Sequence, residues 1–515
     1  MSATDTELGL DRRVAELAAR YRPLAVAILK EAIRIPADEV DRSVDAGGDP
    51  ASGLSNHEGA RLRFLRDTII DIDAVQHADD VWFDEFGNLV WTVTNGFDEM
   101  PPDRKKVVYM DGHSDTVQAL RAQWHDKLGG AVDPYDGLVD PDALDPAALR
   151  AQLGYLPSQD EWQHLVFGRG SADQLAGVVA EIVATKILLE LRDEGALHGC
   201  IVRAYATVAE EDNDGGGPRH LVRTLLPSAA PELIPDVVIL TEGTGDAVKG
   251  ALGIYRGQRG RMQIEVTVTG RSCHGSMPAQ GLNPLEHGGA ILAEAAQRHA
   301  RGEGMRDHPF VGRGTRTASW AVLDSPSDCA VPERFVFRFD RRLSVGETAD
   351  EAVAQIESLD AVSAARSAGL TVDVCVPRYR QSTWTGSAVD NEQVYPGWIT
   401  PDEHPAIRAA VDAYRRVVTP HVTNGEAGAL RSEPRVDTWV FSTDGVGFPV
   451  PLDPMPFAVP AAKQWVVSGA VTHPAMFGIG AGVEQNTHRI GEYVDERELQ
   501  HAIAVLARFP SLFAG

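Results

Sequence analysis

The chain has 515 residues, of which 43% are hydrophobic and 24% charged, a composition typical of a globular protein with room for two or three domains. Its 74 acidic against 48 basic residues give a net charge of −26, which argues against nucleic acid or an anionic membrane surface as a partner. The opening residues contain no apolar leader-like segment, no apolar run is long enough to span a membrane, and the four cysteines are widely separated, so we expect a cytoplasmic protein.

Three segments rich in Val, Ile and Leu each end in polar residues and a turn. In chain order they are "KVVYMDGHSD" from Lys106, "CIVRAYATVAEE" from Cys200 and "DVVILTEGTG" from Asp236. Continuous apolar runs of this length are typical of strands that are covered on both faces. Helical patterns lie between them, notably the segment that begins at Asp173. This alternation predicts a doubly wound α/β domain with a mostly parallel sheet.

Potential metal ligands follow each of these strands. In such a sheet, ligands bind beyond the carboxyl ends of the strands, so side chains at these ends should converge. The side chains in question are those of His113, Glu210, Glu211 and Glu242, with Asp173 at the start of its helix. Holding so many carboxylates together without a cation would be unfavourable. A calcium loop counted from Glu210 is excluded, because its closing position is occupied by Leu221.

The spacing within these motifs indicates different roles. Asp115 lies two residues after His113 and can accept a hydrogen bond from the second imidazole nitrogen, which fixes the tautomer of a metal-bound histidine. Glu210 and Glu211 are adjacent at a strand end, so one can bind metal while the other faces a water molecule as general base. His488, in "GIGAGVEQNTHRIGE", adds a second imidazole. Nitrogen and oxygen ligands without cysteine favour zinc, with manganese or cobalt as alternatives.

The order of these motifs resembles the M20 family of di-metal hydrolases, which includes aminoacylases, carboxypeptidases and succinyl-diaminopimelate desuccinylases. The resemblance runs from about residue 60 to the end of the chain. It looks closest to the branch labelled selenium-metabolism-linked hydrolases, through "YRGQRGRMQIEVTVTGRSCHGSMPAQG", "CAVPERFVFRFDRRLSVGET" and "WVFSTDGV". The resemblance implies two divalent metal ions per chain, held by His113, Asp173, Glu211, Glu242 and His488.

The same resemblance assigns roles to individual residues. Asp173 would bridge the two metals, and the peptide bond between Asp173 and Gln174 would be cis. Glu210 would be the general base, and Asp115 would orient His113.

Residues 253–376 alternate strand and helix patterns in the order βαββαβ, which predicts a ferredoxin-like α+β domain inserted between catalytic parts 1–252 and 377–515. By resemblance this insert is a lid that forms a homodimer and delivers His274, in "SCHGSMP", to the partner's site. Arg342, in "FDRRLSVGE", matches an arginine that grips a substrate carboxylate, although an exposed edge charge is an alternative. Asp444, in "FSTDG", either contacts the substrate or caps a turn.

Three features depart from the family pattern. Cys329 stands where the family has asparagine, and Gly243 stands where the family usually has proline after the fourth ligand. The chain also carries two extra stretches, at 118–163 and 449–473. Both connect to segments that carry expected metal ligands, so we expect both to wall the pocket.

The sequence therefore predicts metal-dependent hydrolysis of an amide bond in a small N-acyl amino acid or dipeptide-like compound, with Glu210 removing a proton from the attacking water. The same activated water would serve deamination or decarbamoylation, and this alternative stays open. A scaffold that only binds or assembles is a third interpretation. The retention of a general base beside a full set of ligands argues against it.

Overall fold

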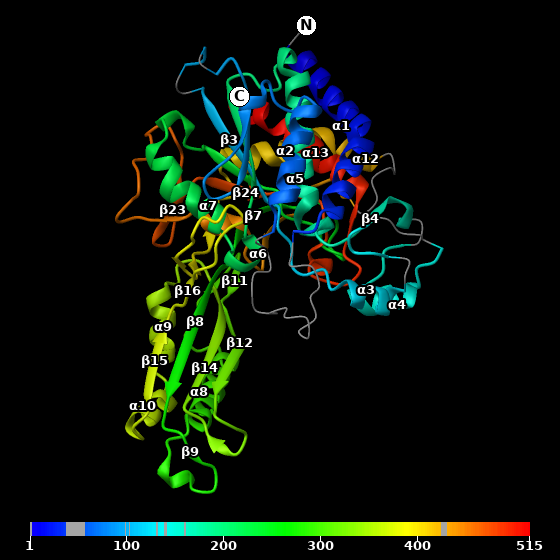
Figure 1. The fold of residues 1–515 in the computed structure, drawn as a ribbon. Helices are drawn as coiled ribbons and strands as arrows, with labels where there is room; N and C mark the ends of the chain where they lie inside the picture. The colour runs from blue at the N-terminus through cyan, green and yellow to red at the C-terminus, as the bar shows by residue number, and fades with distance from the viewer. Residues whose placement is uncertain are drawn as a thin grey trace.

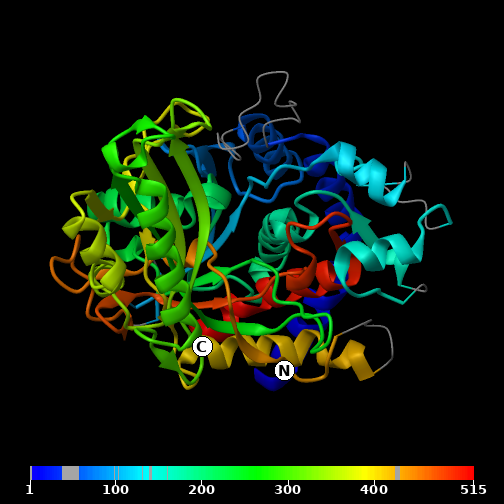
Figure 2. The same ribbon diagram turned by 90° about the horizontal axis from the view of Figure 1, so that it is seen from below.

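The computed structural model describes residues 3–37, 57–97, 99–101, 104–129, 132–137, 142–158, 161–423 and 430–515. These residues form a larger domain around one main sheet and an elongated smaller domain, the lid, that extends away from it (Figure 1). Seen from below, the green and yellow lid lies on one side of the molecule and the cyan segment with α3 (Arg121–Leu128) and α4 (Pro146–Leu153) lies on the other (Figure 2).

The main sheet is parallel at its centre and mixed at its flanks. Its order is β1 (Val81–Phe83), β2 (Leu89–Asn95), β5 (Cys200–Thr207), β3 (Lys106–His113), β6 (Val237–Leu240), β24 (Ala475–Gly478), β7 (Ile254–Gln258) and β19 (Trp398–Ile399), with β20 (Val436–Trp439) also beside β7. Strands β5, β3, β6 and β24 run parallel. Strands β1, β2, β7 and β19 are antiparallel to their neighbours in this order. The predicted α/β fold is confirmed, with parallel pairing concentrated where the apolar runs are fully buried.

Helices cover one face of the main sheet. They are α1 (Ala3–Arg34), α2 (Gly59–Asp71), α5 (Ala176–Glu190), α11 (Pro405–Val417) and α13 (Glu496–Ala514). Helix α5 lies at the centre of this layer and contacts both α1 and α13, so nearly all its side chains are buried. An aromatic-rich core that includes Tyr109, Tyr205, Trp398 and Trp439 fills the other face. In the described ranges, no helix is long and apolar enough to cross a membrane.

The lid follows the predicted βαββαβ order, except that two helices stand where one was expected before the last strand. Its elements are β8 (Gly260–Thr269), α8 (Pro284–Ala300), β12 (Thr315–Asp324), β14 (Arg334–Leu343), α9 (Ala349–Glu357), α10 (Asp360–Ser367) and β15 (Thr371–Cys375). The antiparallel sheet runs β12-β14-β8-β15, and its apolar side chains share one core with the three helices. The short strand β18 (Val394–Tyr395) also pairs with β8. Since β7 pairs within the main sheet, we propose lid boundaries at 260 and 395 rather than at 253 and 376.

The two extra stretches form small substructures of their own. In the first, α3 and α4 bury Trp124 and Trp162 against Ile490 and Tyr493, in the segment that follows His488. In the second, β21 (Val450–Pro451), β22 (Val466–Ser468) and β23 (Val471–His473) make a three-stranded sheet.

Candidate metal centre

The carboxyl ends of β3 and β6 bring His113 and Glu242 together with Asp173. His113 is the last residue of β3 and is fully buried. Its Nε2 atom lies 3.0 Å from Oδ1 of Asp173 and 3.5 Å from Oε2 of Glu242, two residues beyond β6. Asp173 lies in the turn Ser171–Leu175, directly before α5. The peptide bond between Asp173 and Gln174 is cis, which confirms that prediction.

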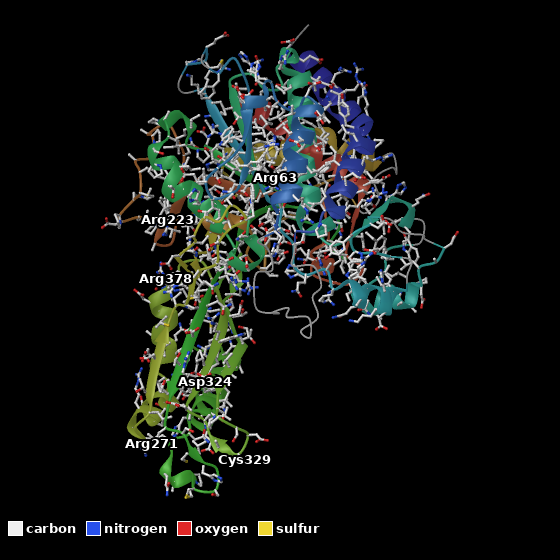
Figure 3. All side chains as sticks on the ribbon, in the orientation of Figure 1. Arg63, Arg223, Arg271, Asp324, Cys329 and Arg378 are labelled. Atoms are coloured by element: carbon white, nitrogen blue, oxygen red, sulfur yellow. The ribbon has the colours of Figure 1, made fainter. Side chains whose placement is uncertain are left out.

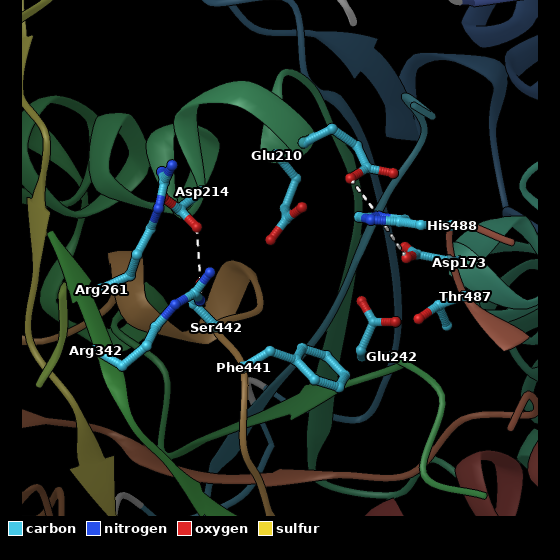
Figure 4. Close-up of a pocket in the computed structure, with 11 residues that line it drawn as sticks. Asp173, Glu210, Asp214, Glu242, Arg261, Arg342, Phe441, Ser442, Thr487 and His488 are labelled. Carbon is cyan, nitrogen blue, oxygen red and sulfur yellow. Dashed lines mark hydrogen bonds and ion pairs between the residues drawn. The ribbon is translucent and has the colours of Figure 1, made fainter. Parts of the chain in front are cut away.

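His488 approaches the same cluster from a loop near the C-terminus. Its Nε2 atom lies 3.1 Å from Oδ2 of Asp173 and 2.9 Å from Oε2 of Glu211. The two oxygens of Asp173 therefore face different imidazoles. The donors fall into two groups that share Asp173: one holds His113 and Glu242, and the other holds His488 and Glu211. Figure 4 shows Asp173 beside His488, with Glu242 near them. Nitrogen and oxygen donors in two groups around one bridging carboxylate fit two divalent ions.

Asp115 connects the histidine motif to the glutamate motif. Its Oδ1 atom lies 3.4 Å from Nδ1 of His113, and the backbone oxygen of Asp115 lies 3.1 Å from the same nitrogen. The two carboxylate oxygens accept hydrogen bonds from the backbone N–H groups of Glu210 (3.1 Å) and Glu211 (2.9 Å). Asp115 thus joins the end of β3, which carries His113, to the turn that carries Glu210 and Glu211.

Glu210 faces the cavity without belonging to either group of donors. It begins the short helix α6 (Glu210–Asn213), and its Oε2 atom lies 3.9 Å from Nε2 of His113. Burial raises the pKa of Glu210 well above its usual value, an effect that His113 opposes and the nearby carboxylate of Glu211 reinforces. Burial and repulsion from Asp173 raise the pKa of Glu242 to about 6. A cation near these carboxylates would favour their charged forms.

The cluster forms one end of a cavity of about 280 Å³. The residues that line it are Asp173, Glu210, Glu211, Asp214, Glu242, Arg261, Arg342, Phe441, Ser442, Thr487 and His488. Arg261 and Arg342 reach it from the lid strands β8 and β14, on the side opposite the histidine and carboxylates (Figure 4). The cavity therefore lies where the lid meets the larger domain.

Arg342 is a cavity residue rather than an exposed edge charge. Its Nη1 atom donates to Oγ of Ser442 at 3.1 Å, and its Nε and Nη2 atoms donate to Asp340 at 2.8 and 3.2 Å. The neighbouring Arg341 is buried and paired with Glu347. Of the two adjacent arginines, only Arg342 lines the cavity.

Asp444 occupies a different place from the one we expected. It is 1% exposed and does not line the cavity. Its Oδ2 atom accepts a hydrogen bond of 2.6 Å from Thr207, at the end of β5. The turn that begins at Asp444 is capped by the side chain of Thr443, which accepts from the N–H of Gly445. Thr443 rather than Asp444 therefore caps this turn, and Asp444 packs against the end of β5. A contact between Asp444 and the substrate stays a prediction.

His274 lies far from this cluster within its own chain. It belongs to the short strand β9 (Cys273–His274), at the end of the lid most distant from the larger domain (Figure 1). Strand β9 pairs with β13 (Ala330–Val331), which places Cys329 at the same tip (Figure 3). The Nδ1 atom of His274 accepts from the N–H of Ser276 at 3.1 Å, so the proton of the neutral ring resides on Nε2.

The two extra stretches do not wall the cavity. None of their described residues lines it. The first stretch contributes Tyr155 and Glu161 to a different cavity of about 340 Å³, and the second contributes Pro451 and Ser468 to one of about 420 Å³. The first stretch packs against Ile490 and Tyr493, and the second packs onto the aromatic-rich core of the main sheet through residues that include Val450 and Trp465.

Two residues support the metal ligands in ways that the sequence did not reveal. Glu492 is fully buried, and its Oε1 atom accepts from the N–H groups of Ala172 and Asp173 at 3.0 and 3.1 Å. Its only sequence signal is its position four residues after His488. Gly243 donates its N–H to Oε1 of Glu242 at 3.2 Å, a bond that proline could not make. The departure from the family pattern thus gives Glu242 a hydrogen bond.

The larger domain has a sheet that is parallel at its centre, and a ferredoxin-like lid is inserted into it. Imidazoles and carboxylates cluster at the strand ends. Together these features define a metal-dependent peptidase or amidohydrolase. Residues 256–361 match the M20 peptidase dimerisation domain. The uncharacterised protein YgeY of Escherichia coli is 32% identical over 409 residues, which cover 76% of this chain and 84% of YgeY. The chain belongs to the M20 family.

Solved structures share this fold over nearly the whole chain. The dipeptidase Dug1p of Saccharomyces cerevisiae is 11% identical and has a TM-score of 0.62 over 98% of both chains. The M20 family metallo-carboxypeptidase Sso-CP2 of Sulfolobus solfataricus is 15% identical, with a TM-score of 0.57 over 95% of this chain and 99% of its own. The narrower likeness to the selenium-metabolism-linked branch stays a prediction.

Proposed function

We propose that this protein is a di-metal hydrolase that cleaves the amide bond of a small N-acyl amino acid or dipeptide-like compound bearing a carboxylate. One observation carries the proposal. Glu210 faces the middle of a single cavity, with the imidazole and carboxylate cluster on one side and Arg342 on the other (Figure 4). A substrate held at both ends would present its central bond to Glu210.

Two groups of residues would hold the metal ions. His113, Asp173 and Glu242 would hold one ion, and His488, Asp173 and Glu211 the other. When bound, such ions polarise a carbonyl group and lower the pKa of water. The donor set favours zinc, with manganese or cobalt as alternatives.

Glu210 would act as the general base. Its carboxylate belongs to neither donor group and lines the cavity. It would accept the proton of the attacking water and then transfer that proton to the leaving nitrogen. A pKa raised by burial suits this role, since the group must both take up and release a proton near neutral pH.

Arg342 would bind the carboxylate of the substrate. A guanidinium can pair with a carboxylate through two parallel hydrogen bonds, which fixes orientation as well as position. Phe441, on the same cavity, offers an apolar surface to the intervening part of the substrate. The cavity volume of about 280 Å³ is at the lower end for ligand pockets, and this favours a small substrate.

The lid would form a homodimer and supply His274 to the site of the partner subunit. Strand β12 is an edge of the lid sheet, and its Trp320, Val322 and Leu323 side chains are 40%, 43% and 41% exposed. Exposed apolar side chains on an edge strand favour pairing with a second copy. The Nε2–H of His274 would then donate to the oxyanion that forms during hydrolysis.

A substrate screen tests the proposed function. Protein loaded with zinc, manganese or cobalt would be incubated with N-acyl amino acids, dipeptides and carbamoyl compounds, and the release of free amine measured. We expect turnover of an N-acyl amino acid or a dipeptide, and much weaker turnover of the same compound with its carboxylate converted to a carboxamide. Turnover of carbamoyl compounds alone, or release of ammonia, would contradict the proposal in favour of decarbamoylation or deamination.

A further inference from the structure

The turn that carries Glu210 and Glu211 is held by side chains from distant parts of the chain. The N–H of Val208 donates to Oδ1 of Asn88 at 3.1 Å, and the N–H of Ala209 donates to Oε1 of Glu58 at 3.1 Å. The N–H groups of the next two residues donate to the carboxylate of Asp115. Four consecutive backbone donors are thus accepted by three side chains.

This turn needs such acceptors because of its position and conformation. It connects the end of β5 to the start of α6, where the first N–H groups of a helix have no partner within the helix. Ala209 has a φ of +60°, a left-handed conformation that is unfavourable for a residue with a side chain. External hydrogen bonds can hold the backbone in this shape, and the shape sets the directions of the next two side chains.

Glu58 immediately precedes α2. The start of this helix contacts the turn that carries Glu210 and Glu211 and also the segment that follows His113. Glu58 is 1% exposed and accepts from Ala209. Arg61, also 1% exposed, donates from Nη1 to the backbone oxygen of Ser114 at 2.6 Å, between His113 and Asp115. The start of α2 therefore supports the segment of His113 through Arg61 and the turn of Glu210 and Glu211 through Glu58.

We propose that Glu58 is a positioning residue, which fixes the turn at Ala209 so that Glu210 faces the cavity and Glu211 faces His488. Glu58 does not line the cavity and would act only through this backbone contact. The inference rests on the proposed function, since it assigns a purpose to the orientation of the general base and of one ligand. Residues that orient metal ligands typically affect metal affinity or activity about 10- to 100-fold.

Three variants separate positioning from general stability. Glu58→Gln keeps an acceptor oxygen for the N–H of Ala209. It also resembles the neutral acid, because burial and the nearby Asp115 raise the pKa of Glu58 well above its usual range. Glu58→Met conserves side-chain length but removes the acceptor. Leu62→Ala, at a fully buried position of the same helix, loosens packing but leaves the acceptors of the turn at Ala209 unchanged.

Zinc affinity is measured for each purified variant by competition with a chelating dye. The values of kcat and KM are measured with a substrate that the wild-type protein turns over. We expect Glu58→Met to weaken zinc binding and lower kcat, each by about 10- to 100-fold, with little change in KM. Glu58→Gln should restore both values close to wild type. Leu62→Ala should lower Tm while the folded protein keeps both values.

The inference is overturned if Glu58→Met binds zinc and turns over substrate like the wild type, or if Leu62→Ala reproduces the same losses. If Glu58→Met does not fold, Asn88→Ala takes its place, because it removes the neighbouring acceptor for the N–H of Val208. Asn88→Ala should also weaken zinc binding and lower kcat. Unchanged zinc affinity and kcat in Asn88→Ala would equally overturn the inference. Glu210→Gln distinguishes the two proposals. Loss of turnover in Glu210→Gln beside an unaffected Glu58→Met refutes only the positioning role, whereas full turnover in Glu210→Gln refutes the proposed function.

Discussion

The carboxylate of Asp173 lies between the imidazoles of His113 and His488, with Oδ1 at 3.0 Å from Nε2 of the first and Oδ2 at 3.1 Å from Nε2 of the second. One histidine ends a central strand of the sheet and the other lies in a loop near the C-terminus. A single carboxylate thus joins two sets of donors that come from opposite ends of the chain.

Two divalent ions per chain are expected from this arrangement. Five donor residues, one of which is the shared carboxylate of Asp173, exceed what a single tetrahedral zinc ion takes. Elemental analysis of protein that has been loaded with zinc and then desalted should give two equivalents per chain. Glu242→Ala should remove one equivalent and Asp173→Ala should remove both. A single tight equivalent in the wild-type protein would contradict the two-metal centre.

Metal binding should release protons and strengthen as the pH rises. Glu211 and Asp173 raise the pKa of His488 above its usual value, and burial raises that of Glu242 to about 6, so in the metal-free protein both side chains hold protons to a higher pH than they normally would. Since a protonated ligand cannot bind metal, zinc affinity should rise as the pH increases through about 6, where Glu242 loses its proton, and should keep rising at higher pH because His488 holds its proton longer. Calorimetry in buffers of different ionisation enthalpy measures the released protons. A pH-independent affinity without proton release would contradict this.

Arg342→Lys should raise KM for carboxylate substrates with a smaller effect on kcat. Lysine keeps the charge but cannot form the paired hydrogen bonds of a guanidinium. A hydrogen bond to a charged group contributes about 1.5–3 kcal/mol, which corresponds to a change in KM of about 10- to 150-fold. The matched control is Arg366→Lys, an exposed arginine on the lid that pairs with Glu357. If both variants kept the wild-type KM, Arg342 would not bind the carboxylate.

His274 should act on the partner's site, since it lies at the tip of the lid, away from its own cluster. Glu210→Ala and His274→Ala chains should therefore complement each other when mixed. In a mixed dimer, the site with an intact Glu210 receives the intact His274 of the other chain. With random exchange of equal amounts, about half of the dimers are mixed and about a quarter of all sites should work.

Subunit exchange in this experiment is verified with two affinity tags. Each variant kept apart from the other supplies the baseline activity. If the tags show complete exchange and activity stays at that baseline, His274 acts within its own chain or has no part in the reaction.

The residues of the cluster could be predicted from the sequence because the carboxyl ends of parallel strands lie along one edge of the sheet. His113 and Glu242 follow apolar runs that had to be neighbouring buried strands, so their meeting could be expected from the pattern alone. Asp173 and His488 were recognised as potential ligands from residue type and position, but the bridging role of Asp173 and the place of His488 in the ligand set needed the family resemblance. The order of the elements in the lid followed from the alternating strand and helix patterns, and the resemblance supplied its expected role in a dimer.

Other features depend on contacts that a sequence pattern does not reveal. Strand β7 has the same appearance whether it joins the lid or the main sheet, and only its pairing with β24 decides. Asp444 follows a strand like the cluster residues, yet it lies behind the sheet end against Thr207. Glu58 gives no local signal, because its partner Ala209 is distant in sequence.

The role of Glu210 as general base is tested by replacing this residue alone. Glu210→Gln should keep both metal ions, because no metal ligand changes, but should lower kcat by about 100- to 10,000-fold, since an amide cannot accept the proton of water. The matched control is Asp212→Asn in the same short helix, whose amide oxygen can still accept the hydrogen bond from Tyr379. We predict two zinc equivalents and nearly abolished turnover in Glu210→Gln, with wild-type values in the control. A Glu210→Gln protein that binds both ions and retains nearly full turnover would contradict this role of Glu210.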